Sequence, residues 1–96
     1  MKNGFVYILT NFNKTVLYVG VTSNLEQRLQ EHRQLSERAS KFAAKYKCKY
    51  LIYYEKHQTI SDAILREKQL KNWHREWKLN LIREINPDFE DLSESL

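Results

Sequence analysis

The sequence predicts a small α/β (α+β) domain in which a three-stranded antiparallel sheet is flanked by helices, in the order β-β-α-β-α-α. Three short runs at 5–9, 16–21 and 50–54 are rich in β-branched and aromatic residues, which is typical of strands. Longer segments near 24–35 and 59–73 repeat apolar residues at helical spacing. The 96 residues are 42% hydrophobic, which suffices for one compact core and is too apolar for disorder.

Local signals define the N-terminal elements. The first two strands flank residues 10–15, whose Asn-Phe-Asn-Lys core is typical of a hairpin turn. The helix over 24–35 follows Ser23, which with Glu26 has the form of a capping box. A basic connection comes next and contains a helical turn near 40–46. The chain then enters the third strand.

The C-terminal half is predicted to be helical. A second long helix begins near Thr59, where Thr59 and Asp62 loosely repeat the capping-box pattern, and continues to about Trp73. The helical pattern resumes after it, through Trp77, Leu81 and Ile82. It ends before Asn86-Pro87, because the residue that precedes a proline resists the α conformation.

Composition excludes several classes of protein. No apolar run approaches the roughly 18 residues of a membrane span, and asparagines interrupt the N-terminal apolar run, so neither a membrane partner nor a signal peptide is expected. The single cysteine, Cys48, excludes an internal disulfide, and the three scattered histidines do not complete a Cys-rich zinc site. We therefore expect a cytoplasmic protein without a disulfide partner. The sequence leaves the oligomeric state open.

Charge is divided unevenly along the chain. The net charge is +4, but residues 1–83 carry 16 basic and 7 acidic residues, whereas residues 84–96 carry 5 acidic residues and no basic one. We expect a domain over residues 1–85, followed by an acidic tail over 86–96. The densest basic stretch comprises Arg38, Lys41, Lys45, Lys47 and Lys49. With Lys71 it is predicted to bind nucleic acid through phosphates, although an ordinary solvated face has the same pattern.

Two of the expected helices carry charged side chains on their apolar faces. Arg28 and His32 lie on or near the stripe formed by Leu25 and Leu29, and Glu67 lies within the apolar arc of the second long helix. A buried charge needs a partner. Either Arg28 and Glu67 form a structural ion pair, or Arg28 binds an anion and Glu67 a metal ion. One glutamate suffices for Mg²⁺, which keeps most of its waters.

Tyr7 and Tyr18 occupy the centres of the first two strands. Tyrosines in such positions commonly pack in the core with hydrogen-bonded hydroxyls. A phenol beside a metal ion and an arginine, however, is expected to have a pKa below its usual value of about 10 and to accept a proton from water. Phosphodiester hydrolysis needs an activated water, a metal ion and a cation near the phosphate. Tyrosine, glutamate and arginine fill these three roles.

The residues in question resemble the signature of the GIY-YIG nuclease superfamily. Phe5-Val6-Tyr7 stands where these nucleases have their first tripeptide, and Tyr18-Val19-Gly20 matches the second. The arginine ten residues after the second tyrosine, the histidine four residues later and a glutamate on a later helix also fit; they are Arg28, His32 and Glu67. The resemblance covers roughly residues 4–77 and is greatest to compact stand-alone bacterial members of the URI type.

This resemblance implies an endonuclease that hydrolyses phosphodiester bonds in DNA, in processes such as repair or recombination. It implies a GIY-YIG fold and a single divalent ion, Mg²⁺ or Mn²⁺, on Glu67. It also implies that Tyr7 lies near the attacking water and Arg28 on the scissile phosphate, with support from Tyr18 and His32. The principal alternative is a nucleic-acid-binding module with little cleavage activity. A further alternative is a structural Arg28–Glu67 ion pair with the function on a protein partner.

The sequence departs from the family pattern at two points. Phe5 replaces the first glycine of the signature. Family members often have a phosphate-binding asparagine near the end of the fold, for which Asn86 is a possible match and Asn72 a competitor. Both asparagines also suit an ordinary role in a turn or at a helix end.

Overall fold

The computed structural model describes residues 2–96 and has the predicted architecture. The elements are β1 (Gly4–Thr10), β2 (Leu17–Thr22), α1 (Leu25–Arg33), α2 (Lys41–Lys45), β3 (Tyr50–His57), α3 (Ile60–Lys71), α4 (Arg75–Ile85) and a terminal 3₁₀ turn (Ser93–Ser95). The strands form one antiparallel sheet in the order β2-β1-β3. The predicted α+β class and its order of strands and long helices are therefore confirmed, with the turn near 40–46 forming the short helix α2.

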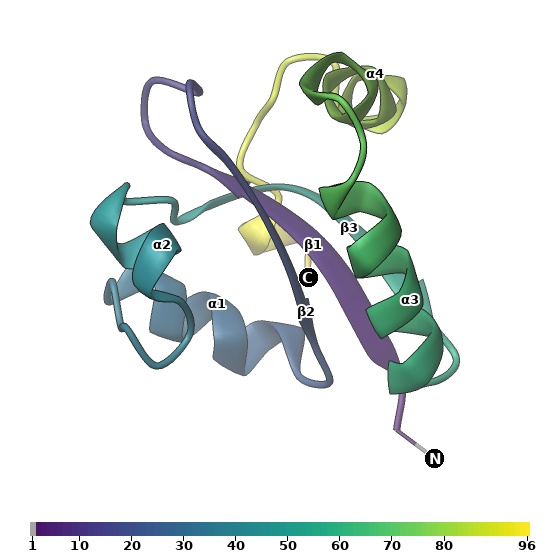
Figure 1. Cartoon of the computed structure of the whole chain (residues 1–96). Coiled ribbons are helices and arrows are strands. Elements are labelled where there is room, and N and C mark those ends of the chain that lie inside the picture. The colour runs from purple at the N-terminus through teal and green to yellow at the C-terminus, as the bar shows by residue number, and fades with distance from the viewer. Residues whose placement is uncertain (1) are drawn as a thin grey trace.

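Helices cover both faces of the sheet. Figure 1 shows α1 and α2 on one side, α3 on the other, and α4 across one end. The alternation of side chains along β1 supplies both cores. Val6 and Ile8 pack with Ala63 of α3 on one face, whereas Tyr7 and Leu9 pack on the other face with the apolar residues of α1 and α2. Each face of the central strand is thus buried under a different helical layer.

Two boundaries differ from the sequence prediction. The N-cap of α1 is Asn24 and not Ser23, because the Asn24 Oδ1 accepts a hydrogen bond from the Gln27 N–H at 3.1 Å. Strand β3 continues three residues beyond Tyr54, to His57. Its extension carries Glu55, which binds the Arg66 guanidinium of α3 with an Nη2–Oε2 distance of 3.0 Å. This ion pair joins residues eleven positions apart, so local sequence patterns do not indicate it.

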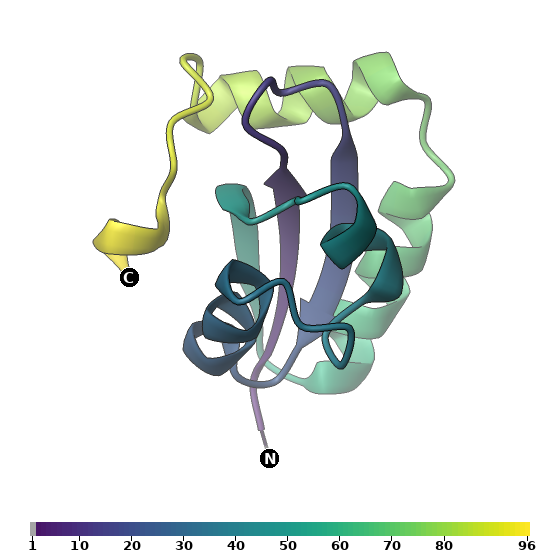
Figure 2. The ribbon, with the colours of Figure 1, turned by 90° about the vertical axis from the view of Figure 1, so that its left-hand side faces the viewer.

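The acidic segment that follows α4 packs against the sheet. The backbone N–H of Leu92 donates to the carbonyl oxygen of Leu51 at 2.7 Å, and the N–H of Leu51 donates to Asp91 Oδ1 at 3.2 Å. Figure 2 shows this segment descending from the end of α4 on the β3 side of the sheet. The expected acidic tail therefore covers part of the outer edge of β3.

Asn86 anchors this segment and is not available to a phosphate. Its side chain is buried, and the Nδ2 group donates to the carbonyl oxygens of Ile52 at 3.0 Å and Glu90 at 2.9 Å. Its Oδ1 accepts from the Glu90 N–H at 3.1 Å. Both amide hydrogens are thus used within the fold, and the prediction of a phosphate-binding Asn86 is wrong. Asn72, the competing residue, is the C-cap of α3.

No helix among residues 2–96 combines the length and the apolar character that a membrane crossing requires.

Candidate active site

Three side chains meet on the α1 face of the sheet, next to the edge strand β2. Tyr7 projects from the centre of β1, Tyr18 from β2 and His32 from α1. The Tyr7 hydroxyl lies 2.9 Å from His32 Nε2. Ring centroids are 6.2 Å apart for Tyr7 and Tyr18, and 5.6 Å for each tyrosine with His32. The structure therefore brings these three predicted residues into one cluster.

Gly20 makes this cluster possible. It lies opposite Tyr7 in the β1–β2 register, and the phenol ring extends across it. A Cβ atom at position 20 would come within 2.4 Å of the Tyr7 ring and hydroxyl, far inside van der Waals contact. The glycine is needed for space and not for an unusual backbone conformation, because no glycine here has a positive φ. The second signature tripeptide thus supplies both a ring, from Tyr18, and room for Tyr7.

Arg28 belongs to the same cluster but has a different ion-pair partner from the one expected. It lies one turn before His32 on α1, so both side chains leave the same side of the helix. Its Nε lies 3.1 Å from Glu31 Oε1, and its charge acts on both Tyr7 and His32. The guanidinium pairs with Glu31 and not with Glu67, so the structural Arg28–Glu67 ion pair considered from the sequence is absent. About a third of the Arg28 side chain remains exposed.

Burial determines the protonation of the central pair. Burial and the neighbouring Tyr18 raise the pKa of the Tyr7 phenol well above its ordinary value of 10, and the opposing effect of Arg28 is smaller. The lowered pKa expected for Tyr7 beside a bound metal ion stays a prediction. Burial, followed by the charge of Arg28, lowers the pKa of His32 to about 4. At neutral pH the pair consists of a neutral phenol and a neutral imidazole, so the Tyr7 O–H can donate to an unprotonated His32 Nε2.

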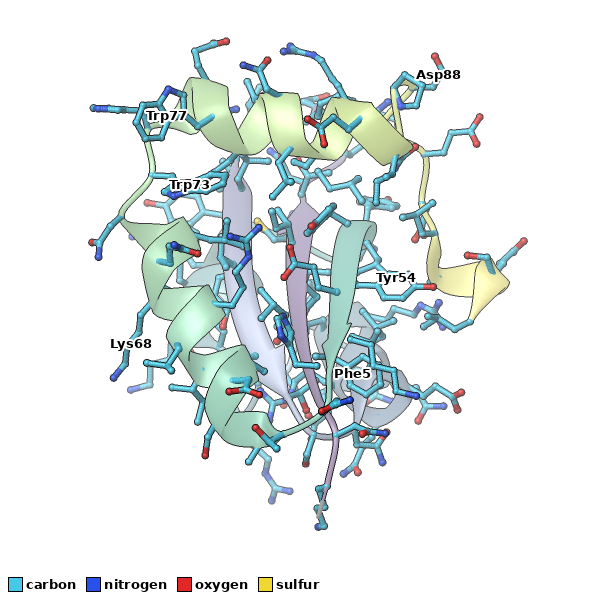
Figure 3. All side chains as sticks on the ribbon, turned by 90° about the vertical axis from the view of Figure 1, so that its right-hand side faces the viewer. Phe5, Tyr54, Lys68, Trp73, Trp77 and Asp88 are labelled. Atoms are coloured by element: carbon cyan, nitrogen blue, oxygen red, sulfur yellow. The ribbon has the colours of Figure 1, made fainter. Side chains whose placement is uncertain are left out.

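Glu67 approaches from the other helical layer. Ala63 and Leu70 form the buried stripe of α3, and at 100° per residue Arg66 and Glu67 lie on opposite flanks of it. Arg66 is bound to Glu55 on β3, so the flank with Glu67 faces the other edge of the sheet, which is β2. Figure 3 shows α3 alongside β2, on the side away from β3. Glu67 thus belongs to the β2 edge but to a different layer from Tyr7.

A shallow cavity at the β2 edge links the two layers. It has a volume of about 280 Å³ and is lined by Leu17, Tyr18, Val19, Phe42, Lys71 and Lys78. Tyr18 and Phe42 come from the α1 side, and the lysines come from α3 and α4. Lys71 Nζ lies 3.0 Å from Glu67 Oε2, which ties the carboxylate to the wall of this cavity. Tyr18 is shared between the cavity and the cluster around Tyr7.

Glu67 fits a hydrated divalent ion better than a protein-enclosed one. Across residues 2–96 no group of three or more His, Cys, Asp or Glu side chains is placed to hold a metal ion. The Glu67 carboxylate is 14% exposed and its present cation partner is the flexible, half-exposed Lys71. A divalent ion that keeps most of its waters needs only one or two carboxylates. A divalent ion at Glu67 would have to keep most of its waters, because one carboxylate does not complete an enclosed metal site.

The basic stretch lies beside the cluster. Arg38, Lys41, Lys45 and Lys47 are exposed and Lys49 is half-buried. Helix α2, which carries two of these lysines, packs Phe42 against Tyr18 with ring centroids 6.2 Å apart. Sequence reasoning missed Phe42 and Tyr46, which are a little less than half exposed. Their alternation with lysines over 41–47 was the available signal, since interleaved aromatic and basic residues are typical of nucleic-acid surfaces.

Comparison with known proteins agrees with this arrangement. A family model described as the GIY-YIG catalytic domain matches residues 3–80. A UPF0213 protein of Syntrophus aciditrophicus (strain SB) is 39% identical over 88 residues, which cover 92% of this chain and 98% of that protein. A UPF0213 protein of Staphylococcus aureus (strain Mu3 / ATCC 700698) is 31% identical over 84 residues, covering 88% of this chain and 99% of the relative. No solved structure matches the chain significantly.

Stability should fall as the pH drops from 6.5 toward 4, because of His32. The unfolded chain binds a proton on this residue near pH 6.5, whereas the folded protein binds it only near pH 4. Protons therefore favour the unfolded state throughout this window, by about 3 kcal/mol at pH 4. Urea unfolding of the wild type and of His32→Gln at pH 7 and pH 4.5 measures the difference. His74→Gln, at the exposed start of α4, is the control and should lose stability like the wild type. If His32→Gln loses as much stability between pH 7 and pH 4.5 as the wild type does, His32 is not the group responsible.

Proposed function

The chain belongs to the GIY-YIG family, and from this premise we propose that it is a metal-dependent endonuclease that hydrolyses phosphodiester bonds in DNA. The observation that carries the proposal is the 2.9 Å contact between the Tyr7 hydroxyl and His32 Nε2, beside Tyr18 and Arg28. A buried phenol joined to a neutral imidazole can both take up and pass on a proton. Core packing alone does not require such a pair next to an exposed arginine.

Tyr7 and His32 would act together on the attacking water. The raised pKa of the Tyr7 phenol makes it a poor source of phenolate at neutral pH. It can still take a proton from water if its own proton moves to His32 Nε2 in the same step. The charge of Arg28 contributes to the low pKa of His32. A substrate phosphate paired with Arg28 would neutralise that charge and make His32 a better proton acceptor.

Arg28 would stabilise the charge that develops on the phosphate. Its guanidinium is partly exposed and held by Glu31 on the same helix, so it can exchange a surface ion pair for a charge-assisted bond to a phosphoryl oxygen. Glu67 is the proposed holder of Mg²⁺ or Mn²⁺. A divalent ion bound there would supply Lewis-acid polarisation of the phosphate. Tyr18 would orient the Tyr7 ring and the water beside it.

The basic residues would provide sequence-independent affinity. Five of them lie in α2 or in the segments that flank it: Arg38, Lys41, Lys45, Lys47 and Lys49. Lys71 lies at the cavity on the β2 edge. Each phosphate neutralised releases counterions from the nucleic acid, which makes binding depend on salt. A nucleic-acid-binding module with little cleavage is the second candidate. The ion pair between Glu67 and Lys71 favours this candidate. A metal ion that binds weakly would not displace Lys71 from Glu67, and the protein would then bind nucleic acid without cleaving it.

Glu67→Ala should abolish cleavage while leaving the fold almost unchanged. Its partner Lys71 is a half-exposed residue one turn away, and such pairs contribute at most about 1 kcal/mol to stability. Cleavage of plasmid, single-stranded and branched DNA with Mg²⁺, Mn²⁺ or EDTA measures the activity, and thermal melting measures the stability. Glu76→Ala, on the exposed first turn of α4, is the matched control and should keep full activity. Retained metal-dependent cleavage by Glu67→Ala would exclude Glu67 as the metal ligand, and a wild type inactive on all three substrates with both ions would favour the binding module.

Replacing Lys41 and Lys45 with Gln should weaken binding of all duplex sequences alike. If about four bases of the stretch touch phosphates, the plot of log affinity against log salt has a slope of roughly −3.6. Loss of two contacts should flatten that slope by about two units. Fluorescence anisotropy in EDTA measures it without cleavage. The double variant Lys2→Gln/Lys56→Gln, which removes the same charge elsewhere, should keep the wild-type slope. If the Lys41/Lys45 variant has the same salt slope as the Lys2/Lys56 control, the basic stretch is only a solvated face.

A further inference from the structure

Three aromatic rings form a continuous ledge beside the candidate active site. Tyr18 and Phe42 lie nearly parallel, with an interplanar angle of 25°, and Phe42 contacts Tyr46 with ring centroids 4.7 Å apart. We call Tyr18, Phe42 and Tyr46 the aromatic ledge. Phe42 is 47% exposed and Tyr46 is 41% exposed. Leaving two adjacent rings in water gains nothing for folding, and contiguous exposed apolar surface commonly marks a binding site.

Cations line the wall of the cavity opposite the ledge. Lys71 and Lys78 face Tyr18 and Phe42 across the β2 edge. Lys78 is half-buried, and burial together with the charges of Arg75 and Lys71 lowers its pKa. Within residues 2–96 no carboxylate forms an ion pair with Lys78. Lys71 is paired with Glu67 at 3.0 Å, so a bound anion would supply the partner that Lys78 lacks.

The aromatic wall and the cationic wall together indicate which kind of ligand the cavity would bind. One wall of the cavity offers the face of an aromatic ring and the other offers ammonium groups, so the ligand must have a flat ring system and a negative charge. A nucleotide has both. In a duplex the base faces are covered by their neighbours, so only an unpaired or extruded nucleotide can stack on a protein ring. The cavity volume of about 280 Å³ is large enough to take one base.

We propose that this cavity binds one unpaired nucleotide of the substrate strand, with its base stacked on Phe42 and its phosphate held by Lys71 and Lys78. The proposal rests on the proposed function and names its substrate class: DNA with unpaired nucleotides next to the bond that is cut. Tyr18 connects the two sites, because it lines the cavity and its ring centroid lies 5.6 Å from that of His32. A stacked nucleotide would therefore lie beside the phosphate presented to Arg28.

A binding experiment tests stacking separately from cleavage. Oligonucleotides that contain 2-aminopurine, single-stranded or fully paired, are titrated with protein in EDTA, and quenching of the 2-aminopurine reports stacking. Phe42→Leu keeps an apolar side chain but removes the aromatic face. It should weaken single-strand binding at least about five-fold and remove the quenching, while duplex affinity stays unchanged. Phe12→Leu is the control, because Phe12 is 80% exposed on the hairpin loop, outside the cavity.

Charge variants test the phosphate half of the site. Lys71→Gln/Lys78→Gln should flatten the salt dependence of single-strand binding by about 1.4 units. Lys68→Gln, which Figure 3 shows pointing away from the sheet on α3, should not flatten it. Tyr46→Leu provides a second ledge variant if Phe42→Leu fails to fold, and should also weaken single-strand binding preferentially. Equal effects of Phe42→Leu on single strands and duplexes, or none on either, would overturn the proposal. Absence of cleavage by the wild type would contradict the proposed function but leave the binding result unaffected.

Discussion

The position of the Tyr7 ring is the constraint on which the rest of the site depends. The ring comes from the central strand, lies across Gly20 of the edge strand, and presents its hydroxyl to His32 of α1 at 2.9 Å. This contact requires the β1–β2 register that places a glycine opposite the tyrosine, because a one-residue slip would turn Tyr7 toward the α3 face. It also fixes the rotation of α1, which carries Arg28 one turn from His32. Removal of the ring from water then keeps both members of the pair neutral.

The edge strand β2 is where the two helical layers meet. Tyr7, His32 and Arg28 lie on one face of the sheet, and Glu67 and Lys71 come from α3, which packs on the opposite face. The Glu55–Arg66 ion pair, with Tyr53 and His57 also bonded to Glu55, fixes α3 against β3. Because Glu67 follows Arg66 directly, this clamp turns Glu67 toward β2. The proposed site, which would draw on both layers at this edge, would suit a strand of nucleic acid that runs past it.

The limits of sequence reasoning here are physical. Strand alternation and helical spacing predict the fold class and place Tyr7, Tyr18, Arg28 and His32 near one another, because each rule concerns residues within one element or adjacent elements. Glu67 was expected in the same site, and it lies on α3 in the other helical layer, paired with Lys71. The raised pKa of Tyr7 comes first from burial, which the sequence does not quantify, whereas the lowered pKa expected beside a metal ion stays a prediction. Asn86 was misassigned because its partners Ile52 and Glu90 become neighbours only after the chain returns to β3. The ion-pair partners of Arg28 and Glu67 are local, Glu31 and Lys71, whereas the sequence offered a distant Arg28–Glu67 pair as an alternative.

The central claim is that the Tyr7 hydroxyl transfers a proton in phosphodiester cleavage, and Tyr7→Phe tests it most directly. Phenylalanine keeps the ring over Gly20 and removes only the hydroxyl, so DNA affinity in EDTA should stay unchanged. The free energy of unfolding should fall by about 1 kcal/mol, because one hydrogen bond is lost. The decisive measurement is the single-turnover cleavage rate with saturating protein and Mg²⁺. Loss of a general base is expected to slow this rate by roughly 100-fold or more. A Tyr7→Phe variant that cleaves at the wild-type rate would show that the Tyr7–His32 contact is structural and that the water is activated elsewhere.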